Sequence, residues 1–418
     1  MDLRARLRAL ESRLGVSPPA TERRESTVPS DAIPLVARLH RVALAHSEWR
    51  AKRSVGPAEI ARIVGGESCA EGVVLVENFL PLSHLHGQVP FARINDVALD
   101  FVAGGVEPER ERLLFIDTET NGLAGGTGTI AFVLGLARIR NQTIEVRQYF
   151  LSAFGGEAAM LSHALEWIAP DAHLVSFNGK SFDAPLLTTR YLLALRRNPL
   201  DGLPHLDLLH RTRAAFRRNW PDCRLQTAEH YLLKLFRTDD VPGHMIPQIW
   251  TDWLQHGDTD RLRGVIDHNR LDVLSLIALA GVLGRAYAEP GHEYADPLGI
   301  ARAHGRAGNA VQAQRHLEDC AQPLTDEARL ELAALYARAD HWDKAVSLWE
   351  QLAQRDVYSA MERLAIYHEH RDRDFDRALR WTERMVENGN DAAAVSKRRA
   401  RLLRRGLAAV SHLRDPAG

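Results

Sequence analysis

The fold prediction rests on one stretch of the chain, Leu113-Leu114-Phe115-Ile116-Asp117-Thr118-Glu119-Thr120. Its four apolar residues predict a buried strand that runs directly into two carboxylates. Because side chains alternate along a strand, Asp117 and Glu119 point to the same face. Two like charges on one buried face repel each other, so a cation or a proton must compensate them. The alternative is a pair of exposed acids at a strand end, and the stretch alone favours neither reading.

The residues after this stretch predict two more strands, 130–139 and 143–150, which form an antiparallel meander with the first. The glycine-rich segment 122–128 lies between two strands rather than between a strand and a helix. Anion binding at a helix terminus therefore does not apply. We interpret the segment as a flexible hairpin beside the acid pair.

Alternating helices and strands follow: a helix over 157–169, a strand over 173–177, a helix over 184–197 and a strand over 205–209. A long apolar-periodic helix then spans 265–287. On it His268 and Asp272 are four residues apart, so both project from one face. A helical histidine is more often structural than catalytic. Here, however, it lies one turn from an acid, in a chain that places Asp117, Glu119 and Asp183 at the ends of its strands.

A basic stretch with interleaved aromatic residues follows the strand 205–209. It contains Arg211, Arg213, Phe216, Arg217, Arg218 and Trp220. Such a stretch can hold a nucleic-acid backbone while a ring stacks on a base. The competing interpretation is a solvated helix face, which is the commoner meaning of a run of charges.

Composition limits the classes of function. The 418 residues allow two or three domains, and 45% hydrophobic with 26% charged residues is ordinary for a globular protein. Lys and Arg total 53 against 54 Asp and Glu, so contact with a polyanion requires local patches or bound metal. Three widely spaced cysteines support neither a zinc site nor a disulfide framework and favour a reducing cytoplasm. We find neither a signal peptide nor an apolar run of membrane-spanning length, and expect no membrane contact.

The last third of the chain predicts helices only. Residues 332–349 resemble residues 364–381, and matched positions are 31–33 apart, close to the tetratricopeptide period. Stacked helix pairs of this kind offer a concave surface that can bind a protein partner. The alternative is a helical cap that only stabilises the preceding half.

Four carboxylates at strand and helix ends, Asp117, Glu119, Asp183 and Asp272, are the ligands that a two-metal site requires. Oxygen ligands suit Mg²⁺ or Mn²⁺. Two such ions ~4 Å apart can activate a water and stabilise the leaving oxygen of a phosphodiester displacement. The sequence therefore predicts two Mg²⁺ or Mn²⁺ ions.

Three motifs make this prediction specific: Asp-x-Glu, Asn-x-x-x-Phe-Asp and His-Asn-x-x-Asp, in the element order β-β-β-α-β-α-β-α. Together they resemble the DEDD 3′–5′ exonucleases of the ribonuclease H-like superfamily, and most closely the YprB-type family. The resemblance covers about residues 70–288. It implies that Asp117 bridges both metals, that Glu119 and Asp272 complete the one holding the attacking water, and that Asp183 serves the second.

The resemblance also indicates which residue acts on the attacking water. Tyrosine-type members carry Tyr four residues before the last Asp, and histidine-type members carry His five before it. Here His268 fills the four-before position, so we expect it to orient or deprotonate the water. The candidate substrate contacts are Thr118, Asn178, Arg211, Arg213 and Arg217.

The expected fold is therefore an α/β ribonuclease H-like domain followed by an all-α domain. The predicted divisions are an N-terminal helix and linker (1–30), an extension packing on the nuclease domain (31–110), the nuclease domain (111–288), tetratricopeptide-like repeats (289–395) and a basic tail (396–418). The expected function is metal-dependent hydrolysis of single-stranded DNA or RNA, by a 3′–5′ exonuclease with a two-metal DEDD mechanism as the resemblance implies. The alternatives are a structure-specific endonuclease, or an adaptor that binds a partner through its repeats and keeps a vestigial site.

Overall fold

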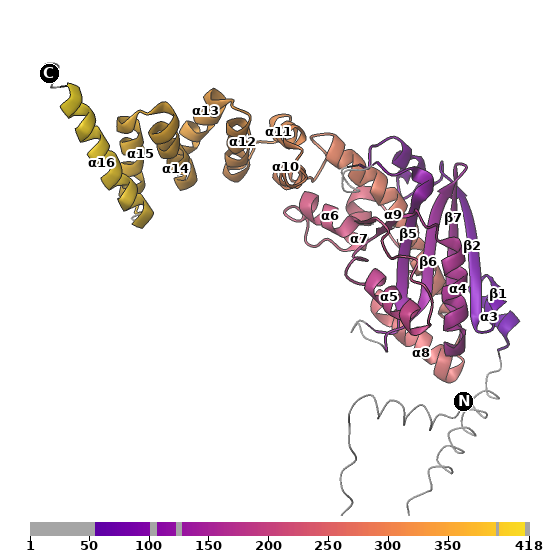
Figure 1. Ribbon diagram of the computed structural model, residues 1–418. Helices are drawn as coiled ribbons and strands as arrows, with labels where there is room; N and C mark the ends of the chain where they lie inside the picture. Colours follow the sequence, from indigo (N-terminus) through magenta and orange to yellow (C-terminus); the bar gives the residue numbers. More distant parts are fainter. Residues whose placement is uncertain (1–54, 101–106, 123–127, 390–392, 414–418) are drawn as a thin grey trace, which may run out of the picture. The chain divides into compact units, whose positions relative to one another are not determined.

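The structure is a computed structural model that describes residues 55–100, 107–122, 128–389 and 393–413 (Figure 1). Side chains of the last helix are described as far as residue 405. The predicted helix and linker at residues 1–30 lie outside the described residues. So does most of the glycine-rich segment.

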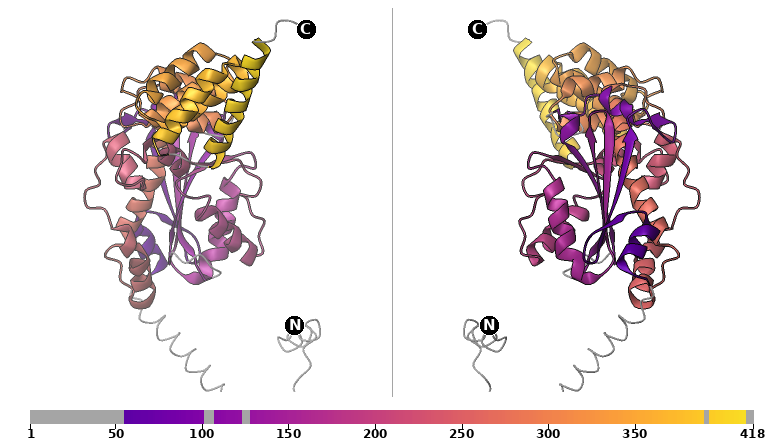
Figure 2. Two further views of the ribbon diagram at one scale, coloured as in Figure 1. Left: turned by 90° about the vertical axis from the view of Figure 1, so that its left-hand side faces the viewer. Right: turned by 90° about the vertical axis from the view of Figure 1, so that its right-hand side faces the viewer.

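A mixed sheet of seven strands forms the first half of the described chain (Figures 1 and 2). In spatial order the strands are β1 (Glu67–Ala70), β2 (Val73–Pro81), β7 (Thr143–Leu151), β6 (Ala131–Arg140), β5 (Leu113–Thr120), β8 (His173–Ser176) and β9 (His205–Asp207). Pairing is antiparallel from β1 to β5 and parallel from β5 to β9. The predicted meander and the α/β ribonuclease H-like order are confirmed. The short strands β3 (Leu85–His86) and β4 (Val89–Pro90) pair separately.

Helices cover the sheet. They are α3 (Pro57–Val64), α4 (Glu157–Trp167), α5 (Asp183–Leu193), α6 (Leu208–Phe216), α7 (Leu225–Ala228), α8 (Ile246–His256) and α9 (Leu262–Ala288). On β5 the side chains alternate between two apolar cores. Leu114 and Ile116 pack in the core that contains α4 and α8, whereas Leu113 and Phe115 pack in the core that contains most of α9. Because side chains alternate along a strand, Asp117 and Glu119 lie on the same face of β5 as Phe115 and are directed toward α9.

Helix α9 is long and apolar enough to cross a membrane, with a mean hydropathy of 1.6 over its best window. The expectation that no apolar run reaches that length is therefore wrong. Its apolar residues have another explanation, because 78% of that window is buried inside the protein. A helix that is apolar on all sides is expected when it runs through a core.

The last third of the chain is wholly helical, as predicted. Its helices are α10 (Pro297–Arg306), α11 (Ala310–Glu318), α12 (Asp326–Arg338), α13 (Trp342–Ala353), α14 (Tyr358–Tyr367), α15 (Phe375–Glu387) and α16 (Ala393–Leu413). Matched repeat positions such as Leu332 and Leu364, or Ala345 and Ala378, are buried in both copies. The internal repeat thus corresponds to repeated packing, while its assignment to the tetratricopeptide class stays a prediction.

Helices α10 and α11 pack on the sheet domain. Ile300 and Ala303 of α10 lie in the same apolar core as α6 and α9. The backbone N–H of Asp296 donates to the carbonyl of Ala215 at 2.6 Å. The imidazole of His316, on α11, lies 2.8 Å from the carbonyl oxygen of Tyr287 at the end of α9. The polar and apolar contacts of the sheet domain therefore continue past residue 288.

Chains that end at residue 290 and at residue 321 should differ in stability. Only the longer chain keeps the buried Ile300, and burial of one such side chain contributes about 1.5–3 kcal/mol. At roughly 2–4 °C per kcal/mol for a domain of this size, we expect the shorter chain to melt at least about 3 °C lower. Thermal unfolding followed by circular dichroism measures this difference. Equal melting temperatures would show that α10 and α11 belong to the repeats alone.

Candidate active site

Four carboxylates meet where β5 faces α9. Asp117 and Glu119 come from β5, Asp183 is the first residue of α5, and Asp272 lies on α9. Burial raises the pKa of Asp117 well above its ordinary value, and the charges of Asp272, Glu119 and Asp183 raise it further. Burial and the charges of Asp272 and Asp183 do the same to Glu119. The structure thus brings the four predicted ligands together as one cluster, in which Asp183 is buried and the other three are half-buried.

A short polar segment positions Asp183. The hydroxyl of Thr118 donates a hydrogen bond to Asp183 Oδ1. Just upstream, the backbone N–H of Asn178 donates to Asp207 Oδ1 at 2.8 Å, and that of Lys180 donates to Asp207 Oδ2 at 3.1 Å. Asn178 has a φ of +71°, a left-handed conformation that Asn tolerates better than most residues. Of the predicted substrate contacts, Thr118 therefore lies beside the acids, and the backbone of Asn178 is bound to Asp207 just upstream of Asp183.

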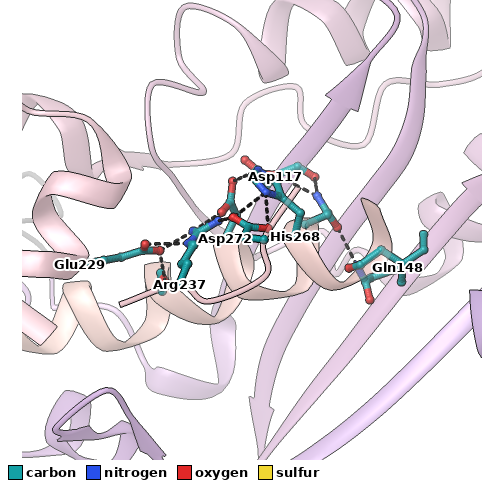
Figure 3. Close-up of polar contacts among 10 residues, drawn as sticks. Asp117, Gln148, Glu229, Arg237, His268 and Asp272 are labelled. Atoms are coloured by element: carbon teal, nitrogen blue, oxygen red, sulfur yellow. Dashed lines mark hydrogen bonds and ion pairs between the residues drawn. The ribbon is translucent and has the colours of Figure 1, made fainter. Parts of the chain in front are cut away.

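Asp117 is held by an amide pair that the sequence analysis did not assign. Asn269 Nδ2 donates to Asp117 Oδ2 at 2.8 Å, and Asn269 Oδ1 accepts from Gln148 Nε2 at 3.0 Å (Figure 3). Gln148 also donates to the carbonyl of Ile266 at 2.7 Å, so its amide orientation is fixed as well. Asn269 approaches β6 so closely that a Cβ on Gly135 would lie 2.2 Å from its Oδ1. This contact explains a glycine inside a strand.

His268 bridges two acids. Its Nδ1 lies 2.8 Å from Asp240 Oδ1, and its Nε2 lies 3.6 Å from Asp272 Oδ2. A carboxylate only accepts hydrogen bonds, so Nδ1 carries the proton donated to Asp240. Nε2 is then directed to the side of Asp272 and Glu119. Three residues, Glu119, His268 and Asp272, each offer one ligand atom, and these three atoms lie within 4.8 Å of one another.

A buried arginine completes the site and was not foreseen from the sequence. Arg237 donates to Asp272 Oδ1 and to Glu229, and its Nη1 lies 3.1 Å from Asp240 Oδ2 (Figure 3). Its side chain is only 6% exposed. Burial raises the pKa of Asp272, while the guanidinium of Arg237 and then His268 oppose that rise. Arg237 therefore supplies part of the positive charge that the cluster requires.

Glu229 in turn anchors this arginine to the N-terminal part of the described chain. It accepts a hydrogen bond from the hydroxyl of Ser275, which lies 2.7 Å from the imidazole of His86. Burial, with the nearby Arg237 charge, lowers the pKa of His86 to about 4, so this imidazole is neutral at physiological pH. His86 thus supports Ser275 through this contact.

The remaining predicted substrate contacts lie elsewhere. Arg211 and Arg213 are on α6 and Arg217 follows it; the carbonyl of Arg211 accepts from the Tyr287 hydroxyl, and the charges of Arg213 and Arg217 act on Cys223. The prediction that an aromatic ring of this stretch stacks on a base is wrong, because Phe216 and Trp220 are only 0% and 6% exposed. They stack on each other with centroids 4.4 Å apart. They are core residues, and they are not available to a nucleobase.

A mixed sheet in this order, with a carboxylate cluster on its fifth strand, defines a ribonuclease H-like domain, a class whose members are generally hydrolytic nucleases. Residues 114–283 match the family RNase_H_2, described as RNase_H superfamily. The chain is also 33% identical over 336 residues to the uncharacterized protein YprB of Bacillus subtilis (strain 168), covering 76% of this chain and 80% of that protein. The chain belongs to the YprB-type ribonuclease H-like family.

The residues present fit the divalent ions that this superfamily commonly uses. Burial raises the pKa values of all four carboxyls, and repulsion within the cluster raises those of Asp117 and Glu119 further, so the ionised cluster requires a positive partner. Arg237 contacts only Asp272 among the four. Oxygen donors of this kind suit Mg²⁺ or Mn²⁺.

The metal-free protein should lose stability as the pH rises, and Asp183→Asn should reduce that loss. Burial raises the pKa of Asp183 from 3.8 to about 6, so the folded state binds this proton more tightly than the unfolded chain. The corresponding stability is present below about pH 4 and is lost as the pH rises through about 6. A shift of this size corresponds to a free energy on the order of 3 kcal/mol. Unfolding in EDTA between about pH 4 and 7 measures it.

In that series the melting temperature of Asp183→Asn, minus that of the wild type, should grow by several degrees with pH. The hydrogen bond from Thr118 is retained, because an asparagine oxygen also accepts. A constant difference across the range would show that Asp183 ionises in the folded protein without penalty.

Proposed function

We propose that this chain is a 3′–5′ exonuclease that hydrolyses single-stranded nucleic acid with two Mg²⁺ or Mn²⁺ ions. The observation that carries the proposal is the convergence of four carboxylates, one buried and three half-buried, with a histidine whose Nδ1 is held by another acid. Asp117, Glu119, Asp183 and Asp272 would hold the ions. When bound, the ions supply positive charge that lowers the pKa of water and stabilises the leaving oxygen. The 3′–5′ direction rests on the family resemblance.

His268 performs the proton transfer in this proposal. Asp240 accepts the Nδ1 proton, so Nε2 offers a lone pair beside Asp272 and Glu119 and can take a proton from the attacking water. Arg237 fixes Asp272 by binding its Oδ1, and Asn269 fixes Asp117 by binding its Oδ2. These contacts keep both carboxylates in one orientation before substrate arrives.

An assay on end-labelled single-stranded DNA and RNA tests the proposal. We expect mononucleotide products with Mg²⁺ or Mn²⁺, loss of a 3′ label before a 5′ label, and no hydrolysis in EDTA. Ladders of internal fragments would instead indicate the endonuclease alternative on the same site. Absence of hydrolysis with every strand and metal would favour the adaptor alternative, in which the acids are vestigial.

A further inference from the structure

A groove of about 520 Å³ lies among α12, α13 and α14, within the helical third of the chain. Its apolar wall includes Ala334 and Ala337 from α12, Trp342 from α13, and Ile366 and Tyr367 from α14. Because the two alanines have small side chains, they leave room for the groove between the larger side chains that line it. A groove of this volume and lining is within the range of sites that bind small ligands or peptide side chains.

The polar residues that line this groove all have cationic side chains or imidazole. They are Arg338, Arg363, His370 and Arg371, and no Asp or Glu lines it. Arg338 and Arg371 each have one ion pair, with Glu331 at 3.3 Å and Asp340 at 2.7 Å, and both acids lie outside the lining. For Arg363, which is exposed, the described residues provide no ion pair. Guanidinium groups around an apolar recess are complementary to carboxylates around an apolar side chain.

We propose that this groove binds a segment of a partner protein in which an apolar side chain is flanked by Asp or Glu. The apolar side chain would pack against Ala334, Ala337 and Ile366, and the flanking carboxylates would pair with Arg363 and its cationic neighbours. Nothing in this proposal depends on the nuclease activity. The chain's own residues 1–54 are an unsuitable occupant, because they contain more Lys and Arg than Asp and Glu.

Two observations favour a peptide over a nucleic-acid strand. A strand needs free ring faces and an extended positive surface. Here Tyr367 already stacks on Trp342 with centroids 5.5 Å apart, Arg371 lies 4.5 Å over the same Trp342 ring, and Trp349 is 4% exposed. Over residues 291–418, Lys and Arg also equal Asp and Glu in number, so no general positive field attracts a polyanion.

A peptide array probed with the full-length protein tests the proposal. Each spot holds a 12-residue peptide with central Leu, Phe or Tyr flanked by Asp and Glu, and a matched spot replaces every acid with Lys. The strongest binder is then measured by fluorescence polarisation against the wild type, Arg363→Glu and Arg380→Glu. Arg380 is the matched control, because it is exposed on α15, lies outside the groove and has no ion pair within the described residues.

We expect acidic spots to bind and their Lys counterparts not to bind. Arg363→Glu should weaken the selected peptide at least about tenfold, because it replaces an attraction by a repulsion, while Arg380→Glu should bind as the wild type does. The proposal is overturned if no acidic spot exceeds its Lys counterpart, or if both variants bind like the wild type. It is equally overturned if a labelled oligothymidylate, and no peptide, binds in a manner sensitive to Arg363→Glu.

Discussion

Asp117→Asn should abolish phosphodiester hydrolysis while leaving the metal-free protein at least as stable as the wild type. Asp117 is half-buried beside three other acids that raise its pKa, so its ionised form requires a positive partner. The variant removes one charge from this cluster and keeps an oxygen that can accept from Asn269. We expect activity to fall by more than the ~100-fold that loss of an outer-shell partner typically costs a metal site.

Thermal unfolding with and without Mn²⁺ separates this effect from misfolding. A ligand that binds only the folded state raises the melting temperature, so Mn²⁺ should stabilise the wild type more than Asp117→Asn. Asp201→Asn is the control, since Asp201 is exposed and lies outside the cluster. Wild-type turnover by Asp117→Asn in metal-replete buffer would refute the assignment of the site.

His268→Ala should lower turnover by about 10²- to 10⁴-fold at saturating Mn²⁺, the usual cost of losing a general base. Metal affinity should change little, because the four carboxylates remain. His268→Tyr should recover part of the loss, since tyrosine-type relatives place Tyr at this position. Single-turnover rates over a Mn²⁺ titration measure both quantities.

Two outcomes would contradict the assigned role. An alanine variant as active as the wild type would make His268 a bystander. A variant whose Mn²⁺ requirement rises sharply would instead make His268 a metal ligand, since it shares with Glu119 and Asp272 the set of ligand atoms that lie within 4.8 Å of one another.

Local patterns predicted the parts of this protein that are built from regular elements. The apolar run of β5 and the periodicity of α9 were sufficient to place Asp117 and Asp272, because side-chain direction follows directly from strand and helix geometry. Phe216 and Trp220 show the limit of such patterns. Their spacing among arginines resembles a binding surface, but only tertiary packing shows that both rings are buried.

Arg237, Asp240 and Glu229 could not be predicted in this way. Arg237 and Asp240 lie in the irregular segment between α7 and α8, and Glu229 begins a single turn of π-helix. Arg237 meets Asp272 at a separation of 35 residues, and Asp240 meets His268 at a separation of 28. No periodicity links such positions. The remaining signal in the sequence was the local concentration of charge, which is common on protein surfaces and therefore uninformative alone.

The hydrogen bonds to the carboxylates also affect which cation the cluster can select. Asn269 donates to one oxygen of Asp117, Thr118 to one oxygen of Asp183, and Arg237 to one oxygen of Asp272. Each donor competes for that oxygen and leaves the other as the better ligand. Ca²⁺ favours six to eight oxygens and often takes both from one carboxylate, whereas Mg²⁺ needs fewer and fills its shell with water. In the proposed two-metal site, we therefore expect these hydrogen bonds to disfavour Ca²⁺ relative to Mg²⁺.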